Sequence, residues 1–293
     1  MDASGWSASA HLHFDQGPDS DAITRHQGQA TAPLKLQRAF HQADGRCELP
    51  LLHTAGGLVG GDGLEITADL GPDSRALITS VAAQKVYGTV GRSLRAPEGR
   101  WAEQVLRFKL ESGADLEWFP QELVVFADGL FRQEFTVSLA AGASFMGVEV
   151  VRLGRSAAGE TLGRGCWQGD LEIRRGEGWE LVDRLALGGE CLRDEHGMAA
   201  EPVFGSLVWA APERIPVSDL DRVVQGARDD RGDRPGTMAC GRLPQGIVAR
   251  YRGPSSQAAR WWFSRIWSRT RTARGLHPPE WPRVWPFQED PMA

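Results

Sequence analysis

The sequence predicts a mainly β fold in which strands stack in layers, in the manner of a β-helix. Apolar and polar residues alternate with a period of two almost throughout residues 33–210, which is typical of strands that bury one face. Three segments, 70–76, 110–116 and 139–145, share one layout: a strand ends at leucine, a short turn follows and a new strand begins. Their spacings of 40 and 29 residues are too uneven for a strict repeat array but suit stacked β layers.

The first part of the chain predicts few elements. Residues 1–30 are polar and weakly patterned, and a loop is expected at 17–21. Strands are expected from about residue 33, separated by turns such as Arg175-Gly176-Glu177-Gly178. The length of 293 residues is enough to bury a large core, and we expect 1–293 to form a single domain.

Helix signals are confined to the last third of the chain. A short helix is expected near 217–225, where a capping residue precedes apolar residues at helical spacing. A C-terminal helix is expected over 254–275, because Gly253 and Pro254 precede it and Gly275 follows. A proline-rich tail over 276–293 ends the chain.

Composition excludes several classes of protein. Hydrophobic content of 41% and charged content of 24% are ordinary for a globular protein, and the net charge of −5 argues against nucleic-acid binding. The four cysteines form no C-x-x-C pair, which argues against a zinc ribbon. There is no apolar run of about 18 residues and no charged-then-apolar N-terminal signal. We therefore expect a cytoplasmic protein without a membrane contact.

The glycine-rich segment 52–66 is the most informative motif. Its two glycine pairs, Gly56-Gly57 and Gly60-Gly61, permit positive φ and close approach of backbones, which indicates a tight turn or crossing. The chain contains no Gly-Lys dipeptide and no G-x-G-x-x-G after a strand, so this turn is not a known phosphate-binding loop. No G-x-S-x-G motif and no local cysteine–histidine arrangement indicates a nucleophile.

Four carboxylates are in phase with apolar residues, where an acid is costly unless it has a partner or a metal. Asp62 is in phase with Leu64 and Ile66. The others are Glu149 with Phe145, Gly147, Val151 and Leu153; Asp183 with Trp179, Leu181 and Leu185; and Glu122 with Trp118, Pro120, Val124 and Phe126. Any one of them could be a buried acid paired with an arginine. Together they indicate a polar path or pocket that supports either acid–base chemistry or a divalent ion.

An arginine-rich region surrounds the C-terminal helix. Between residues 234 and 279 there are nine arginines and no acid. This pattern fits a solvated helix face, and it also fits a surface for a partner protein, because arginine and tryptophan are enriched at interface hot spots. The residues expected at such a surface are Arg260, Arg265, Arg269 and Trp262.

Several motifs, in the right order over residues 33–285, resemble the urease accessory protein family UreD, also called UreH. They are L-H-T-A-G-G-L-V-G-G-D-G-L-E-I at 52–66, A-L-I-T at 76–79, A-Q-K-V-Y at 83–87, L-E-W-F-P-Q-E at 116–122, L-G-R-S-A-A-G-E at 153–160, the helix at 261–274 and P-P-E-W-P-R-V-W at 278–285. Two positions depart from the family pattern: Gln84 replaces a small hydroxyl residue, and Gly88 replaces an arginine.

The resemblance implies a role rather than a reaction. Such proteins are similar to non-enzymatic scaffolds that bind apo-urease and, with the accessory protein UreF and the GTPase UreG, help to load nickel. It also implies an internal passage for transient nickel, with no tightly bound cofactor. By motif position the acids of that passage correspond to Asp62, Glu149 and Asp183, and more weakly Glu122. Spaced oxygen ligands suit a passage, because the ion must enter and also leave.

Two alternatives remain open at this stage. One is a carboxylate-dependent β-solenoid hydrolase or lyase acting on sugar polymers, which would need an open cleft lined by aromatic residues, with two acids within about 10 Å. The other is a structural adaptor without an ion path, in which every one of these acids would be paired with an arginine.

Overall fold

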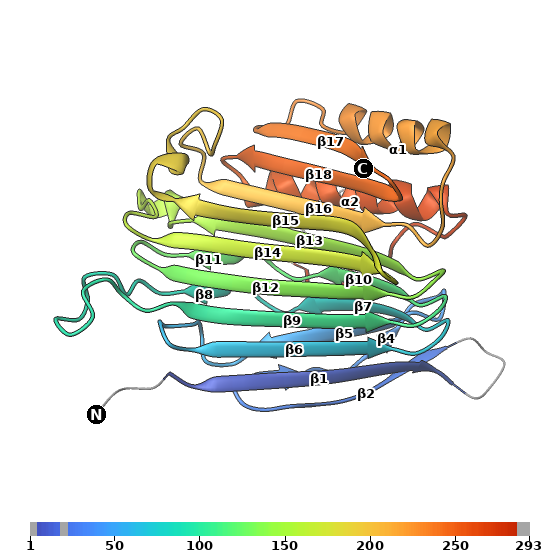
Figure 1. Ribbon diagram of the computed structural model, residues 1–293, viewed down its shortest axis with the longest axis horizontal. Coiled ribbons are helices and arrows are strands. Elements are labelled where there is room, and N and C mark those ends of the chain that lie inside the picture. The colour runs from blue at the N-terminus through green and yellow to red at the C-terminus, as the bar shows by residue number, and fades with distance from the viewer. Residues whose placement is uncertain (1–4, 18–22, 286–293) are drawn as a thin grey trace.

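The computed structural model describes residues 5–17 and 23–285. It is mainly β, with 46% of the described residues in strands and 14% in helical elements. Two β-sheets lie face to face, and two helices cover the outer face of one of them (Figure 1). The prediction of a mainly β, layered fold with a C-terminal helix is therefore confirmed.

Each sheet has a continuous strand order. Sheet A contains, in order, β15 (Gly178–Gly188), β14 (Cys166–Arg175), β12 (Leu130–Leu139), β9 (Ala102–Leu110), β6 (Gly63–Leu70), β1 (Ser7–Gln16) and β2 (Thr24–Ala30). Sheet B contains β17 (Thr237–Leu243), β18 (Gly246–Gly253), β16 (Val203–Ala210), β13 (Ser144–Leu153), β10 (Asp115–Phe119), β7 (Arg75–Ser80), β5 (Cys47–His53) and β3 (Leu34–Leu36). Three short strands extend sheet B. The strand β4 (Phe40–His41) pairs with β5, β11 (Leu123–Val125) pairs with β13, and β8 (Gln84–Val86) pairs with β11.

The middle of the chain winds between the two sheets as a β-helix does. Successive strands β6, β7, β9, β10, β12 and β13 alternate between sheets A and B and pair in parallel with the strand one coil away. The three similar turns of the sequence are the corners of successive coils, stacked on one another. The amide of Asp73 donates to the carbonyl of Ser112 at 2.9 Å, and the amide of Ser144 donates to the carbonyl of Ala114 at 2.8 Å.

Two hydrophobic cores result, one on each face of sheet B. The alternation along β13 supplies both, because successive side chains of a strand point to opposite faces. Phe145 and Val151 lie in the core between the sheets, whereas Met146 and Val148 lie in the core beneath the helices. The sequence therefore assigned Glu149 to the correct face of its strand.

The helices are α1 (Val217–Asp229) and α2 (Ser256–Ala273), close to the expected 217–225 and 254–275. The Ser255 hydroxyl caps α2 by accepting a hydrogen bond from the amide of Ala258 at 3.2 Å. The expected side-chain cap of α1 is wrong, since Pro216 occupies the cap position and makes no side-chain hydrogen bond to the helix. Among the described residues, no helix is long and apolar enough to cross a membrane.

The expectation of weak patterning over residues 1–30 needs correction. Strands β1 and β2 form one side of sheet A, and β1 runs parallel to β6. The buried residues of β1 include Ala8 and Ala10, and such small side chains give a weak hydrophobic signal. Most of the expected loop at 17–21 lies outside the described residues.

The described part of the tail, residues 276–285, packs back onto the helix side of sheet B. The Trp285 indole donates to the Thr79 hydroxyl at 2.9 Å, and its ring lies 5.9 Å from the ring of Trp267 in α2. The ring of Trp281 lies 5.7 Å from Trp267 as well. The tail therefore belongs to the helix-side core, and residues 286–293 lie outside the described part of the chain.

Candidate functional site

A cavity of about 210 Å³ lies between sheets A and B. Its lining extends from Asp183 and Ser206 to His53 and Gly56 at the other side of the molecule. Strands β16 and β5, which carry Ser206 and His53, are four strand spacings apart in sheet B, or roughly 19 Å at about 4.8 Å per spacing. The cavity is therefore long and narrow rather than round.

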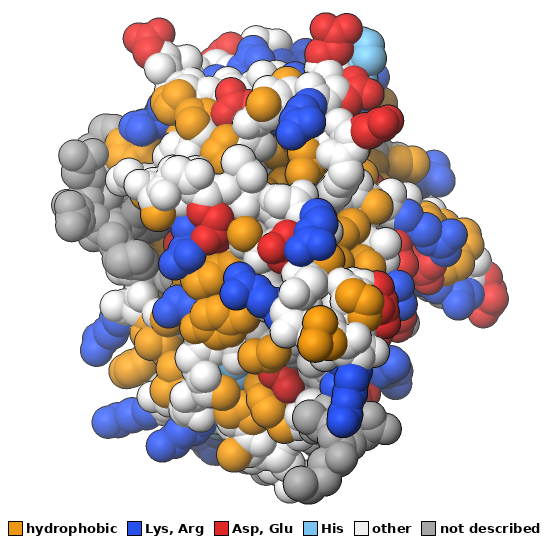
Figure 2. Space-filling model, turned by 90° about the vertical axis from the view of Figure 1, so that its left-hand side faces the viewer, with side chains coloured by type: hydrophobic (Ala, Val, Ile, Leu, Met, Phe, Trp, Pro, Cys, Tyr) orange, Lys and Arg blue, Asp and Glu red, His pale blue; other side chains and the backbone are white. Residues whose placement is uncertain are grey.

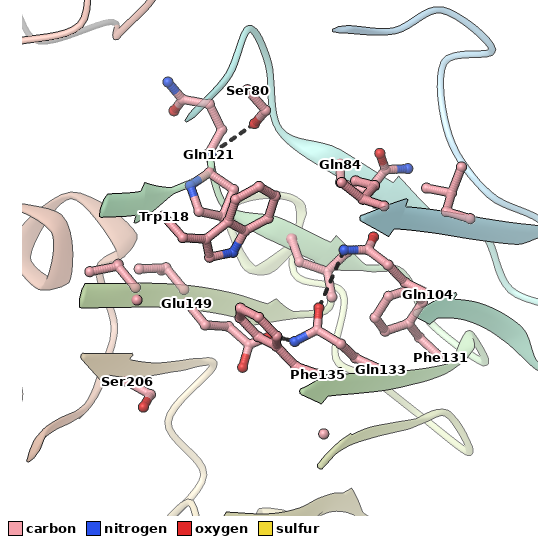
Figure 3. Close-up of a pocket in the computed structure, with 18 of the residues that line it drawn as sticks. Ser80, Gln84, Gln104, Trp118, Gln121, Phe131, Gln133, Phe135, Glu149 and Ser206 are labelled. Carbon is pink, nitrogen blue, oxygen red and sulfur yellow. Dashed lines mark hydrogen bonds between the residues drawn. The ribbon is translucent and has the colours of Figure 1, made fainter. Parts of the chain in front are cut away.

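The walls of the cavity are mostly apolar, with several aromatic rings among them, and a short row of polar groups crosses it. The aromatic residues that line it are Trp118, Phe131, Phe135, Phe145, Trp167 and Phe204. The Gln133 amide donates to the Glu149 carboxylate at 2.8 Å, and the Gln104 amide donates to the Gln133 carbonyl oxygen at 3.5 Å (Figure 3). Because Gln104 and Gln133 come from sheet A and Glu149 from sheet B, these hydrogen bonds connect the two sheets.

Glu149 is the acid whose ionisation the cavity affects most. Burial raises the pKa of its carboxyl to about 7, and the negative charge of Asp183 acts in the same direction. The hydrogen bond from Gln133 and the charge of Arg250 oppose this increase without cancelling it. Near neutral pH the Glu149 carboxyl therefore exists in both its protonated and its ionised form.

Asp183 lines the same cavity and has a cationic partner. The Arg250 guanidinium of β18 donates one hydrogen bond to the Asp183 carboxylate and another to the Ser206 hydroxyl. The expected phase of Trp179 with Asp183 is wrong, because a bulge opposite Ile173 and Arg174 shifts the strand by one residue. The Trp179 side chain is consequently exposed, although Asp183 still faces inward.

Asp62 is buried, as its phase predicted, but it is not among the residues that line the cavity. Its two carboxylate oxygens accept hydrogen bonds from the backbone amides of Trp6, at 3.2 Å, and Val59, at 2.7 Å. Asp62 therefore joins the glycine-rich turn to the segment before β1. A role for Asp62 as a metal ligand stays a prediction.

The glycines around Asp62 occupy restricted backbone positions. Gly56 and Gly61 have φ values of +76° and +98°, in the left-handed region that favours glycine. A Cβ at Gly60 would come within 2.3 Å of the Arg100 carbonyl oxygen, and a Cβ at Gly57 would meet the ring of Tyr87. The turn packs so closely on its neighbours that side chains at these positions would displace it.

The two departures from the family pattern have local structural explanations. Gln84 lines the cavity, and its amide lies 3.3 Å from the Nδ1 atom of His53. At Gly88 a Cβ would come within 2.1 Å of the carbonyl oxygen of Ala127, so an arginine would not fit this backbone. Gln84 thus makes a glutamine–histidine contact at the cavity wall, and Gly88 leaves room for the Ala127 carbonyl.

Glu122 is outside the cavity lining, and its expected phase with Trp118 is wrong. The strand is interrupted between β10 and β11, so alternation does not carry through residues 120–122. The Glu122 carboxylate instead accepts a hydrogen bond from Arg260 of α2 at 2.9 Å. Glu122 is thus a partly exposed acid paired with a buried arginine.

The residues expected at a partner surface are divided between the interior and the exterior. Trp262 is fully buried beneath α1, and its indole donates to the carbonyl of Ala227 at 2.6 Å. Arg260 is also buried. Arg265 and Arg269 are partly exposed and both form salt bridges with Asp230, beside a groove between α1 and α2. Contact of these two arginines with a partner stays a prediction.

The sequence interpretation missed several polar residues at or beside the cavity, among them Gln104, Gln133 and Arg250. The two glutamines are in phase with buried apolar neighbours, as the acids are, so the same alternation could have revealed them. Arg250 could not be found in this way. In β18 Arg250 shares the less buried face with Arg252, so alternation alone would assign it to the solvent side and not to the cavity.

A second group of buried charges lies on the outer face of sheet B, beneath α2. Glu117 accepts hydrogen bonds from Arg271 at 2.7 and 2.8 Å, and Asp115 accepts one from Arg46 at 2.7 Å. The Arg46 guanidinium also lies 3.4 Å from the Glu117 carboxylate. These charges neutralise one another and hold α2 against the sheet.

The cavity offers oxygen atoms rather than a closed ligand cage. Within residues 5–17 and 23–285, no cluster of three or more histidine, cysteine, aspartate or glutamate side chains is placed to hold a metal ion. Two carboxylates with nearby amide and hydroxyl oxygens can hold a divalent cation only loosely. Such a site suits passage or brief retention better than storage.

The fold and the site together define a two-layered β-helix protein with a narrow, mostly apolar internal cavity that is crossed by a few polar groups. Comparison with known families then identifies the relatives: the family described as UreD urease accessory protein matches residues 7–286. The chain belongs to this family. A protein of Parasynechococcus marenigrum (strain WH8102) named urease accessory protein UreD is 58% identical over 291 residues, which are 98% of this chain and 93% of the relative.

A second relative gives the same result. A protein of Prochlorococcus marinus (strain MIT 9313), also named urease accessory protein UreD, is 59% identical over 272 residues, which cover 92% of this chain and 85% of the relative. The resemblance inferred from the motifs is therefore confirmed at the level of the family.

Proposed function

We propose that this chain is a non-enzymatic scaffold that works in the cytoplasm with apo-urease and with UreF-like and UreG-like proteins, and that nickel passes through its internal cavity. Membership of the urease accessory protein family supports the association with urease. The observation that carries the passage is that Glu149 and Asp183 line one cavity between the sheets. They are two of the three acids that motif position assigns to the passage.

The geometry favours this proposal over the alternatives. A hydrolase or lyase needs an open cleft for a polymer, whereas these acids line a long, narrow cavity between the two sheets. A purely structural adaptor would pair each acid with an arginine. Glu149 is instead hydrogen bonded to the neutral amide of Gln133. A carboxylate that is not fully neutralised is available to a cation.

The test is activation of urease in cells that express this chain with urease and the other accessory proteins. We expect Glu149→Gln combined with Asp183→Asn to lower both urease activity and the nickel content of purified urease about tenfold or more, because both charged ligands are lost. Glu65→Gln is the matched control, since Glu65 is exposed and paired with Arg107 outside the cavity. Full activation by the double variant would remove the passage from the proposal.

A further inference from the structure

Arg250 has a special position relative to the two cavity acids. In the register of sheet B, Glu149, Ser206 and Arg250 face one another across the adjacent strands β13, β16 and β18. Directly opposed residues of antiparallel strands point to the same face, so all three side chains point toward sheet A. Asp183 reaches this row from β15 of sheet A. One guanidinium thus lies within reach of both layers.

The Arg250–Asp183 ion pair lies at the end of the cavity where β15 forms the last strand of sheet A. The side chains of Arg250 and Asp183 are 30% and 20% exposed. Ion pairs that retain contact with water contribute little to stability and can open readily. The fully buried Arg46–Asp115 pair on the other face of sheet B has no such freedom.

The charges at this end of the cavity do not balance. Glu149 and Asp183 contribute two negative charges when both are ionised, and Arg250 contributes one positive charge. A divalent cation alone would neutralise the two carboxylates, whereas a divalent cation together with the guanidinium would leave an excess positive charge. Two cations at close range in a partly buried site repel each other strongly.

We propose that Arg250 is an internal counter-ion that alternates with the transported divalent cation on Asp183. The guanidinium forms an ion pair with Asp183 when the passage is empty. It separates from Asp183 when the cation binds there, and the ion pair forms again when the cation leaves. The Ser206 hydroxyl holds the guanidinium near the site. This inference rests on the proposed function, and it makes Arg250 the residue that keeps the affinity for nickel low enough for release.

The test measures binding of nickel ion alone to the purified full-length chain in complex with its accessory partners, by equilibrium dialysis. We expect Arg250→Gln to bind nickel about tenfold or more tightly than the wild type, since the competing charge is gone. Arg250→Lys should bind like the wild type because it keeps the charge, and it also shows that a substituted chain folds. In Arg250→Gln with Asp183→Asn, the gain in affinity should disappear.

Arg252→Gln is the matched control. Arg252 lies two residues away on the same face of β18, but its guanidinium donates to the backbone carbonyl of Glu195 at 2.7 Å. This variant should leave nickel affinity unchanged. A merely structural role of Arg250 would not raise affinity on its removal. Equal or weaker binding by Arg250→Gln therefore overturns the counter-ion inference.

The outcome for Arg250 is separable from that for the passage itself. If Arg250→Gln gives no gain while the Glu149 and Asp183 variants still impair urease activation, the passage stands and the counter-ion inference fails. If the acid variants activate urease fully and none of the substitutions changes nickel binding, both proposals fail.

Discussion

The two faces of sheet B both bury carboxylates, but they neutralise them to different extents. On the outer face, Glu117 is bound by Arg271, is close to Arg46, and accepts a hydrogen bond from the Trp267 indole at 2.6 Å. On the inner face, Glu149 receives a hydrogen bond from neutral Gln133. Arg250, whose charge also acts on Glu149, is paired with Asp183.

This difference separates a structural use of buried charge from a functional one. Although burial opposes it, the guanidinium groups of Arg46 and Arg274 hold the pKa of Asp115 below its usual range. Burial instead raises the pKa of Glu149 to about 7. Acids surrounded by arginines attach the helix layer to the sheet. An acid that lacks such partners is costly to keep ionised, and it gains most from a visiting cation.

One end of the molecule differs from the face of sheet B that the two helices cover, because apolar and basic side chains are mixed on its surface. Figure 2 shows this end, where hydrophobic side chains lie among lysines and arginines. The exposed apolar residues of the chain include Val59 and Tyr87 of the glycine-rich turn region and Leu94 of the long loop that projects beyond β8 and β9 (Figure 1).

The largest expected effect tests whether the outer charges are structural. Arg46→Met leaves Asp115 and Glu117 buried with one cation fewer, so we expect the free energy of unfolding to fall by about 3–5 kcal/mol. Arg250→Gln on the inner face should cost less than about 1 kcal/mol, because that pair is partly exposed. Urea denaturation of both variants provides the measurement. Similar losses for the two would remove the distinction between the faces.

The next expected effect is on the pH dependence of the free energy of unfolding, to which Glu149 on the inner face and Asp115 on the outer face contribute with opposite signs. The folded-state pKa of Glu149, about 7, exceeds its unfolded value of 4.5, so folding is favoured most below pH 4.5 and this advantage is lost as pH rises toward 7. Asp115 has a lowered pKa, so its contribution is present above its unfolded pKa of 3.8 and is lost as pH falls below that value.

Glu149→Gln isolates the inner contribution. The variant should be more stable than the wild type by up to about 3 kcal/mol at pH 8, where an ionised Glu149 is costly. The difference should disappear near pH 4.5. Urea denaturation of both proteins across this pH range provides the measurement, and a difference that does not vary with pH would contradict the assignment of the raised pKa to Glu149.

The smallest expected effect is a shift in the pKa of Glu149 on the inner face. The hydrogen bond from Gln133 lowers the pKa of Glu149, so Gln133→Leu should raise that pKa further, by about 0.5–1 pH unit. Carbon-13 NMR titration of the glutamate carboxyl groups would measure it. Gln168→Leu is the control, since Gln168 bonds to Arg132 at 3.2 Å instead of to Glu149. An unchanged titration in Gln133→Leu would mean that this hydrogen bond is not formed in solution.

Local alternation identified the inward-facing residues wherever a strand was continuous. It correctly assigned Asp62 to a buried position and Glu149 to the inner face of its strand, and the three similar turns predicted the stacked corners of the coils. It failed at Trp179 and Glu122, where a bulge and an interruption change the phase. A period of two holds only while the backbone stays regularly extended, and nothing in the local pattern marked these irregularities.

The sequence by itself determined the β class, the layered winding, the two helices and the family, because these follow from short-range patterns and ordered motifs. Only the tertiary structure decided which acids are neutralised. Asp183 meets Arg250 across 67 residues of sequence, and Glu122 meets Arg260 across 138. Electrostatic interactions depend on distance and burial, and both are set by contacts between segments far apart in the chain.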